Sequence, residues 1–382
     1  MITARLQGGF KAFMAAVLAL SLAGTAPAVA FAADAGAAAG TYKAASIANG
    51  EAPLSYKART VSKAYGARFT NKLAVNTDAP VAYSSSNRKV ATVDATGRVA
   101  AKGVGTATIK ATSPATAACA AGSASYKLVV TPRAVALKSL KAAKGGFQAT
   151  WAKGSKADTT GYQIRYSKYR DLSGARTKKV AKRTTAGTVL KKLSGPANCF
   201  AQVRAYAKGK DGRTYYGAWS KTKQVIGSLN SGDKVLDADV KALIKRFGTG
   251  DGALKAAFNY ITDLRYKSAA TNLKGAWTKA AAKKMYRAKA GNCYEKAALL
   301  GWVAKGLGYN ANPVAGKLVN VKLSGEAVAN PHGWVEVRWN GKKLFCDPDT
   351  TKTLKGLGAK EVRGHSTYLY LVENGKPYTY KR

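Results

Sequence analysis

From residue 42 to residue 133, small apolar residues alternate with polar residues in short runs. Val90–Asp94, Gly103–Ile109 and Tyr126–Val130 are three of these runs, and Gly, Asn and Asp residues separate them. A period of two places successive side chains on opposite faces of a strand. The segment 42–133 is therefore predicted to be a β-sandwich.

Residues 134–226 repeat this alternation with larger, aromatic side chains. Phe147–Trp151, Gly161–Ser167 and Phe200–Tyr206 each alternate, and Pro132 marks the boundary with the preceding segment. A second β-sandwich is predicted over 134–226.

The pattern becomes helical after a short linker at 226–231. Apolar residues recur at helical spacing in Val240–Phe247 and Leu254–Tyr266, and strand patterns follow in Asn310–Val319 and Val328–Trp339. A late strand is expected over Tyr368–Val372. Helices followed by antiparallel strands are typical of an α+β domain, which we place at 233–382.

A tight hairpin is predicted near residue 340. Asn340 and Gly341 stand between two strand patterns, and Asn-Gly is the strongest short hairpin signal. A two-residue loop would pair Trp339 with Lys342. This register places His332 and Asp347 on one face as diagonal neighbours, within reach of a hydrogen bond.

The N-terminus has the pattern of an export signal. Basic Arg5 and Lys11 flank the apolar run Ala12–Leu22, and Ala30–Ala32 offers a cleavage site of small residues. We therefore expect a signal peptide at 1–32, a flexible Ala/Gly-rich leader at 33–41, and a secreted or surface-associated mature protein. No second long apolar segment follows in the sequence, so no membrane anchor is expected after cleavage.

Positive charge is spread along the chain, whose formal net charge is +44. The segment 134–231 carries 21 basic and 3 acidic residues, the strongest imbalance of the three segments. An exported protein of this charge is expected to meet the anionic polymers and lipid head groups of a cell envelope, more than nucleic acid. A basic surface that only keeps the protein solvated is the alternative reading. The sequence points to no particular oligomeric state.

The candidate chemistry centres on Cys293. Gly291 and Asn292 precede it, and a helical pattern follows, so the thiol would lie at the positive end of a helix, where the thiolate is favoured. His332 and Asp347 come later in the chain, and together these three residue types compose an activated thiol nucleophile. The simpler reading of Cys293 is a small buried apolar residue.

Three segments resemble known families. Gly-x-Cys at the helix start, His-x-Trp-Val-Glu-Val 39 residues later and Asp-Pro 15 residues beyond that resemble the transglutaminase-like superfamily over roughly 233–382. Residues 84–109, with VATVD and GTATI, resemble bacterial immunoglobulin-like group 2 domains. Residues 134–226, with GYQIRYS, QVRAY and a closing G-x-WS, resemble a fibronectin type III domain.

These resemblances imply a multidomain protein: two all-β sandwiches, immunoglobulin-like and fibronectin type III-like, before a papain-like α+β domain. In that domain Cys293 would attack a carboxamide, His332 would take its proton and Asp347 would orient His332. Protein or peptide substrates are expected, including peptidoglycan peptides, and the reaction is acyl transfer or amide hydrolysis. Tyr286 and Trp277 are candidate second donors to the oxyanion.

No cofactor or metal is expected, because the Cys and His residues lack the paired spacing of metal motifs. The four cysteines are scattered along the chain, so no obligatory disulfide is expected. Cys346 should be a buried apolar residue, and Glu295 should interact with the helix N-terminus. The alternative function is an inactive envelope-binding or adhesion protein that uses the three modules as a scaffold.

Overall fold

The computed structural model describes residues 53–191, 193, 197–209, 211–321, 327–349, 362–363, 369–373 and 376–380. The predicted signal peptide at 1–32 and leader at 33–41 lie outside the described residues. Among the described residues, no helix is both long and apolar enough to cross a membrane.

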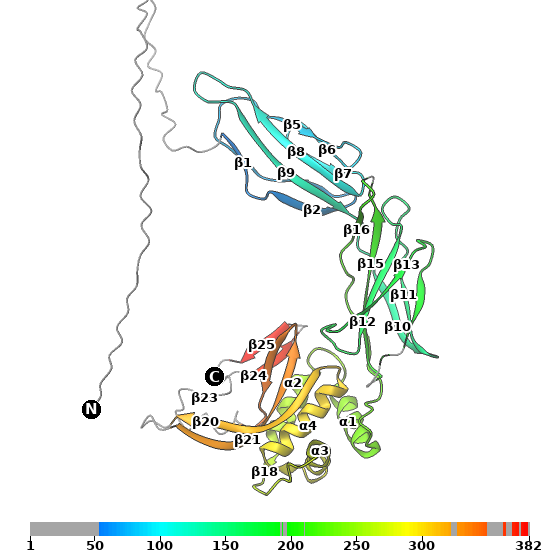
Figure 1. Ribbon diagram of the computed structural model, residues 1–382, viewed down its shortest axis with the longest axis vertical. Coiled ribbons are helices and arrows are strands. Elements are labelled where there is room, and N and C mark those ends of the chain that lie inside the picture. Colours follow the sequence, from blue (N-terminus) through cyan, green and yellow to red (C-terminus); the bar gives the residue numbers. More distant parts are fainter. Residues whose placement is uncertain are drawn as a thin grey trace, which may run out of the picture. The chain divides into compact units, whose positions relative to one another are not determined.

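The N-terminal part is a sandwich of short strands, as the alternating pattern predicts (Figure 1). One sheet has the order β2-β9-β8-β5 and a second has the order β3-β7-β6, while β1 pairs with β4. Val99, Ile109 and Leu128 lie in the apolar core of this sandwich. The strands are β1 Leu54–Tyr56, β2 Thr60–Ala64, β3 Arg68–Thr70, β4 Leu73–Val75, β5 Ala82–Ser85, β6 Ala91–Val93, β7 Arg98–Ala101, β8 Gly105–Ser113 and β9 Gly122–Thr131.

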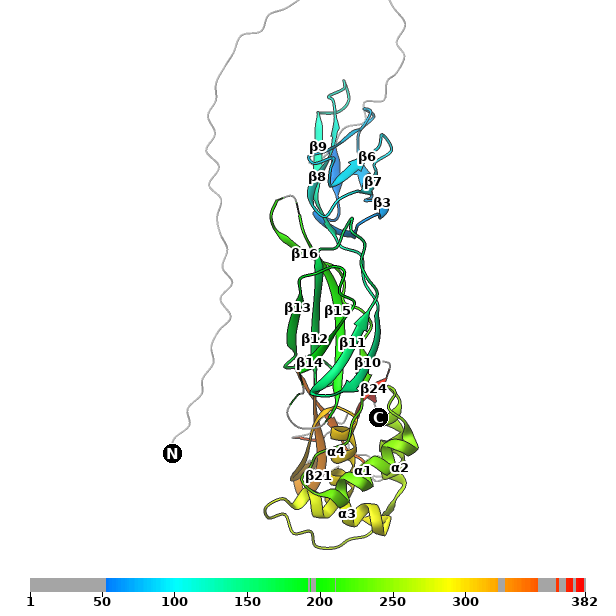
Figure 2. The same cartoon turned by 90° about the vertical axis from the view of Figure 1, so that its right-hand side faces the viewer.

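The second sandwich follows directly in the chain. One sheet has the order β10-β11-β14, and the other has the order β13-β12-β15-β16 with β17 also paired to β15 (Figure 2). Trp151, Tyr162 and Leu190 fill its core. The strands are β10 Leu137–Ala143, β11 Gly146–Trp151, β12 Gly161–Ser167, β13 Arg176–Val180, β14 Gly187–Lys191, β15 Cys199–Lys208, β16 Thr214–Tyr216 and β17 Lys223–Val225.

The C-terminal part combines helices with an antiparallel sheet. The helices are α1 Lys234–Phe247, α2 Ala253–Asp263, α3 Trp277–Ala288 and α4 Cys293–Gly306. The sheet has the order β22-β21-β20-β23, from β20 Asn310–Val321, β21 Ala327–Trp339, β22 Lys342–Cys346 and β23 Val362–Arg363. β24 Leu369–Glu373 and β25 Lys376–Tyr380 form a further hairpin, close to the predicted late strand.

Helix α4 is the centre of this part. It packs against α3 and against β20 and β21, and Ala297, Leu300 and Val303 are fully or almost fully buried (Figure 1). Burial of apolar area at this helix is the main force that holds α4 to the sheet. The nucleophile candidate therefore stands on the most enclosed helix of the domain.

The hairpin register is confirmed. Trp339 pairs with Lys342, and Val335 pairs with Cys346. Asn340 has φ 49° and Gly341 has φ 76°, the left-handed backbone that a type I′ turn requires. Local turn chemistry thus fixes which side chains of β21 and β22 share a face.

One helix boundary differs from the predicted pattern. Helix α2 ends at Asp263, although apolar spacing continues to Tyr266. Arg265–Tyr266 instead forms β18, which pairs in parallel with β19, Ala290–Gly291. This short pairing holds Tyr266 beside the start of α4.

Candidate active site

The first turn of α4 is held by a capping box. The Asn292 side chain accepts a hydrogen bond from the Glu295 amide at 3.2 Å, and the Glu295 carboxylate accepts one from the Asn292 amide at 3.1 Å. Glu295 also pairs with Lys284 at 2.7 Å, and its side chain is buried. These contacts confirm that Glu295 serves the helix N-terminus. They fix Cys293 as the first residue of the helix.

Cys293 is buried at this helix start, with 6% of its surface exposed. The first amides of a helix have no carbonyl partner within the helix, and they point out of its N-terminal end. Negative charge that develops beside the thiol would therefore meet backbone N–H groups and the positive end of the helix dipole.

Strand β21 brings His332 to the thiol because Gly333 lets it come close. A Cβ atom at Gly333 would lie 2.8 Å from the Cα atom of Tyr294, the second residue of α4. Real Cβ atoms essentially never show so short a contact. Glycine at this position allows the strand backbone to touch the first turn of the helix.

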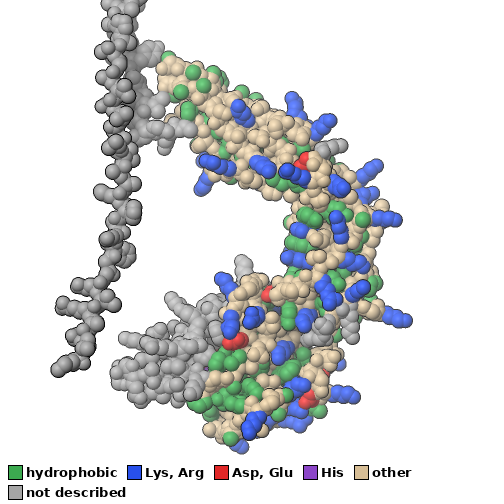
Figure 3. Space-filling view, in the orientation of Figure 1, with side chains coloured by type: hydrophobic (Ala, Val, Ile, Leu, Met, Phe, Trp, Pro, Cys, Tyr) green, Lys and Arg blue, Asp and Glu red, His purple; other side chains and the backbone are tan. Residues whose placement is uncertain are grey.

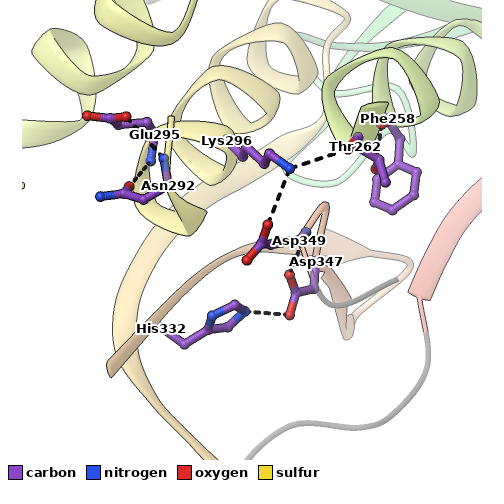
Figure 4. A network of polar contacts seen from close by, with 8 residues as sticks. All are labelled: Phe258, Thr262, Asn292, Glu295, Lys296, His332, Asp347 and Asp349. Atoms are coloured by element: carbon purple, nitrogen blue, oxygen red, sulfur yellow. Dashed lines mark hydrogen bonds and ion pairs between the residues drawn. The ribbon is translucent and has the colours of Figure 1, made fainter. Parts of the chain in front are cut away.

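His332 lies between Asp347 and Cys293. Its Nε2 atom is 2.7 Å from Oδ2 of Asp347 (Figure 4). Its ring also hydrogen-bonds with the Cys293 side chain. Burial alone would lower the pKa of His332, but the hydrogen bonds with Asp347 and Cys293 outweigh it and raise the pKa to about 10. The neighbours therefore strongly favour the charged imidazolium. The predicted contact between His332 and Asp347 is confirmed.

Asp349 and Lys296 complete the polar network, and the sequence patterns did not single them out. Lys296 is 4% exposed at its side chain, and its ammonium is 3.2 Å from the Asp349 carboxylate and 3.3 Å from the Thr262 carbonyl oxygen. The Asp349 amide donates to Asp347 at 3.0 Å. Figure 4 shows both aspartates between His332 and Lys296.

Tyr266 is a further neighbour of the thiol. Burial, followed by the negative charges of Cys293 and Asp349, raises the pKa of its phenol. About half of its surface is exposed, at 54%. Its position makes it a candidate contact for a substrate that enters beside Cys293.

The two aromatic residues named from sequence have other contacts. Trp277 packs edge-on against Tyr294 with 6.1 Å between ring centroids. The Lys289 ammonium lies 3.7 Å from the ring centroid of Tyr286. Trp277 therefore contacts Tyr294, the residue after Cys293, while Tyr286 contacts a cation at the end of its own helix.

Two other cysteines are also buried. Burial raises the pKa of both Cys199 and Cys346 to about 12, with the charge of Asp347 as a smaller cause for Cys346. The prediction that Cys346 is a buried apolar residue is confirmed, since it is 1% exposed. The second histidine, His365, lies outside the described residues.

Basic side chains occur on the surface of each part of the chain. Figure 3 shows Lys and Arg on both sandwiches and on the C-terminal part, with few Asp or Glu between them. On the second sandwich some of these cations stack on aromatic rings, as Arg204 does on Trp219 at 4.2 Å and Arg165 does at 4.5 Å. Within each part, the basic side chains seen in this view are scattered.

Two family models match parts of the chain. Residues 276–350 match the N-acetyltransferase family, and this range includes Cys293, His332 and Asp347. Residues 69–116 match the intimin immunoglobulin-like domain. The immunoglobulin-like character of the first sandwich is thereby supported. No transglutaminase-like family is among the matches. An acyltransferase is suggested for the C-terminal part.

Comparison with curated proteins gives no match. Among solved structures, "Myokine structure" is 17% identical, covers 25% of this chain and 96% of its own, and has a TM-score of 0.21. The crystal structure of chicken CNTN1 FN1-FN3 domains is 17% identical, covers 46% of this chain and 64% of its own, and has a TM-score of 0.22. At these scores neither likeness bears on activity.

Proposed function

We propose that the C-terminal domain is a thiol acyltransferase in which Cys293 is the nucleophile, His332 the acid–base group and Asp347 the residue that orients His332. The observation that carries this proposal is the hydrogen-bonded series Cys293–His332–Asp347 at the start of α4. The match to the N-acetyltransferase family over the same residues supports it. A second carboxylate, that of Asp349, lies within 4.8 Å of the same sulfur and a ring nitrogen of His332.

In the first half-reaction, Sγ of Cys293 attacks the carbonyl carbon of an acyl donor. His332 holds the proton of the Cys293 thiol as an imidazolium, and Nδ1 is the nitrogen left for that proton because Nε2 is held by Asp347. The carbon–heteroatom bond of the donor then breaks, and the leaving group takes the proton from His332. A thioester on Cys293 remains.

In the second half-reaction, an acceptor attacks the thioester carbon. His332 takes the acceptor's proton and returns a proton to the sulfur as the carbon–sulfur bond breaks. An amine acceptor gives a new amide, and water gives a carboxylate. Asp347 stabilises the imidazolium in both halves.

The tetrahedral intermediates carry an oxyanion that needs donors. The Cys293 backbone amide at the helix start is one proposed donor. Tyr266, which lies beside the thiol, is the better candidate for the second donor than Tyr286, whose ring contacts Lys289.

The deciding experiment offers the purified protein an acyl donor together with a labelled primary amine. A glutamine peptide and a small acetyl thioester are the two donors, because they represent the transglutaminase-like and N-acetyltransferase-like reactions. Label in the product supports transfer, and carboxylate alone supports hydrolysis. Failure of both donors to form a thioester on Cys293, detected by mass spectrometry, would favour the scaffold function.

We further propose that the protein acts at the cell envelope, with peptides of the wall as acyl donors. The match of 69–116 to an intimin immunoglobulin-like domain and the net charge of +44 support a surface location. Retention on isolated walls should fall steeply with salt, because the screening length shortens to about 3 Å at 1 M. Retention that does not change with salt would count against attachment through the basic surface.

A further inference from the structure

Three metal-ligand atoms converge at the thiol from three separate segments. Cys293 begins α4, His332 lies in β21, and Asp349 follows β22. A sulfur, a ring nitrogen and a carboxylate oxygen of these residues all lie within 4.8 Å of one another. The two other residues of the network contact members of this group: Asp347 contacts His332, and Lys296 pairs with Asp349 (Figure 4).

The spacing suits a tetrahedral ion. Bond lengths of about 2.0–2.3 Å place the ligand atoms of a tetrahedral zinc site roughly 3.3–3.8 Å apart. Atoms that already lie within 4.8 Å need shifts of only about 1 Å or less to reach that geometry. Side-chain rotation can supply shifts of this size, and 16% of the Asp349 side chain is exposed.

The second contact of His332 strengthens this reading. Nε2 of His332 is held by Asp347, so the other ring nitrogen is the one available to an ion once it releases its proton. Histidine ligands in zinc sites usually donate their far N–H to a carboxylate, which fixes the tautomer and the ring orientation. Asp347 already has this position.

The charges also balance. A thiolate at Cys293 and carboxylates at Asp347 and Asp349 carry three negative charges, and the buried Lys296 ammonium offsets one of them. Two negative charges remain when His332 is neutral, as a metal-bound imidazole is. A divalent cation would neutralise this buried group.

We propose that Cys293, His332 and Asp349 form a binding site for a thiophilic divalent cation of the Zn²⁺ class, oriented by Asp347 and open at a fourth position. The bound ion occupies the lone pairs of the sulfur and the ring nitrogen that acyl transfer needs. Metal binding and acylation therefore exclude each other, and a chelator restores the thiol. The site shares residues with the proposed function, but its existence does not depend on turnover.

The test measures metal binding by the full chain after treatment with EDTA and dialysis. Zn²⁺ affinity is obtained by competition with a chromophoric chelator, and Co²⁺ reports the thiolate ligand through its sulfur-to-metal absorption band. The intact protein should bind one Zn²⁺ and show this band. Cys293→Ala should abolish the band, and a band that persists would overturn the proposal.

Asp349→Asn separates this site from simple binding by a Cys–His pair. It should weaken Zn²⁺ binding by more than about tenfold, since even outer partners of a metal site contribute about 10–100-fold. The matched control is Asp251→Asn, which removes another carboxylate paired to a nearly buried cation, Arg170. The control should keep the affinity of the intact protein. Equal affinity in Asp349→Asn would remove Asp349 from the site.

The Lys296→Met variant tests whether weaker Zn²⁺ binding in Asp349→Asn comes from loss of a ligand or from loss of folding. Removing the ammonium beside Asp349 should tighten Zn²⁺ binding, a change that unfolding cannot produce. Unchanged or weaker binding would count against Asp349 as a ligand. If the protein binds Zn²⁺ but transfers no acyl group when EDTA keeps it free of metal, only the proposed function is refuted. If it transfers an acyl group but binds no Zn²⁺, only the metal site is refuted.

Discussion

The core of the second sandwich and the start of α4 each bury a cysteine, but the side chains around the two cysteines differ. Cys199 is 0% exposed among apolar side chains, and burial raises its pKa to about 12. Cys293 is 6% exposed, and its buried neighbours include Asn292, Lys296 and His332. The same residue type is an apolar core residue in one region and a hydrogen-bonded partner of histidine in the other.

The comparison separates amount of charge from arrangement of charge. The segment 134–231 has the larger excess of basic residues. Among the described residues, three buried ionisable side chains lie close to Cys293 in the structure, namely Glu295, Lys296 and His332, whereas the segment 134–231 buries Asp158. Burying charged groups is costly unless they are paired, so a cluster of buried ionisable side chains indicates a candidate functional site. The net charge of a segment does not show where such a cluster lies.

Replacing the two cysteines should give the largest contrast. Cys293→Ala should reduce acyl transfer by roughly 10⁴–10⁶-fold, because the nucleophile and the histidine act as a unit. Cys199→Ala should leave the rate unchanged and lower the free energy of unfolding by about 1 kcal/mol. Single-turnover kinetics and denaturant unfolding measure the two effects. A comparable rate loss in both variants would erase the distinction.

Gly333→Ala should cause the second-largest loss of acyl-transfer rate. The new Cβ would contact the backbone of Tyr294 and push His332 away from the thiol. A misplacement of about 1 Å can reduce a catalysed rate by about 10²-fold. Gly250→Ala is the control, because no atom lies within 4 Å of the added Cβ there. A Gly333→Ala protein with full activity would show that the strand does not need this close approach.

Alkylation should order the thiols by their surroundings. Iodoacetamide should modify Cys293 before Cys199 and Cys346, because burial raises the pKa of those two thiols to about 12. His332→Gln should slow modification of Cys293 several-fold and leave the partly exposed Cys119 unaffected. Peptide mapping by mass spectrometry follows each site. Faster labelling of Cys346 than of Cys293 would contradict the assignment of the nucleophile.

The smallest effect concerns stability and pH. The pKa of His332 is raised from 6.5 to about 10 in the folded protein, so the folded state holds this proton more tightly than the unfolded chain. The stabilisation is fully present below about pH 6.5 and is lost as pH rises toward 10. The Tm difference between the wild type and His332→Gln should therefore shrink over this range. A difference that grows with pH would reverse the sign of the coupling.

Local chemistry made part of the site predictable. Asn340 and Gly341 define the turn, the turn defines the register, and the register places His332 and Asp347 on the same face. Each of these features could be predicted from residues that are close together in the sequence. The helix start at Cys293 followed in the same way from its capping residues.

The remaining residues depend on packing between distant segments. Lys296 meets Asp349 and Thr262 only after α4, α2 and the loop that follows β22 come together. Tyr266 lies opposite Gly291, near the start of α4, because β18 pairs with β19. Helix α2 ends earlier than its apolar spacing indicated. The spacing of residues within one segment cannot predict contacts between segments that are distant in the sequence.

The close approach at Gly333 also limits how this gene can drift. Every glycine codon begins with two guanines, and a change at either one encodes a residue with a Cβ atom or a stop. Each such residue would place an atom against the backbone of Tyr294. Position 333 therefore has no neutral amino-acid neighbour in the genetic code, and only silent third-base changes should accumulate there among active descendants of this chain.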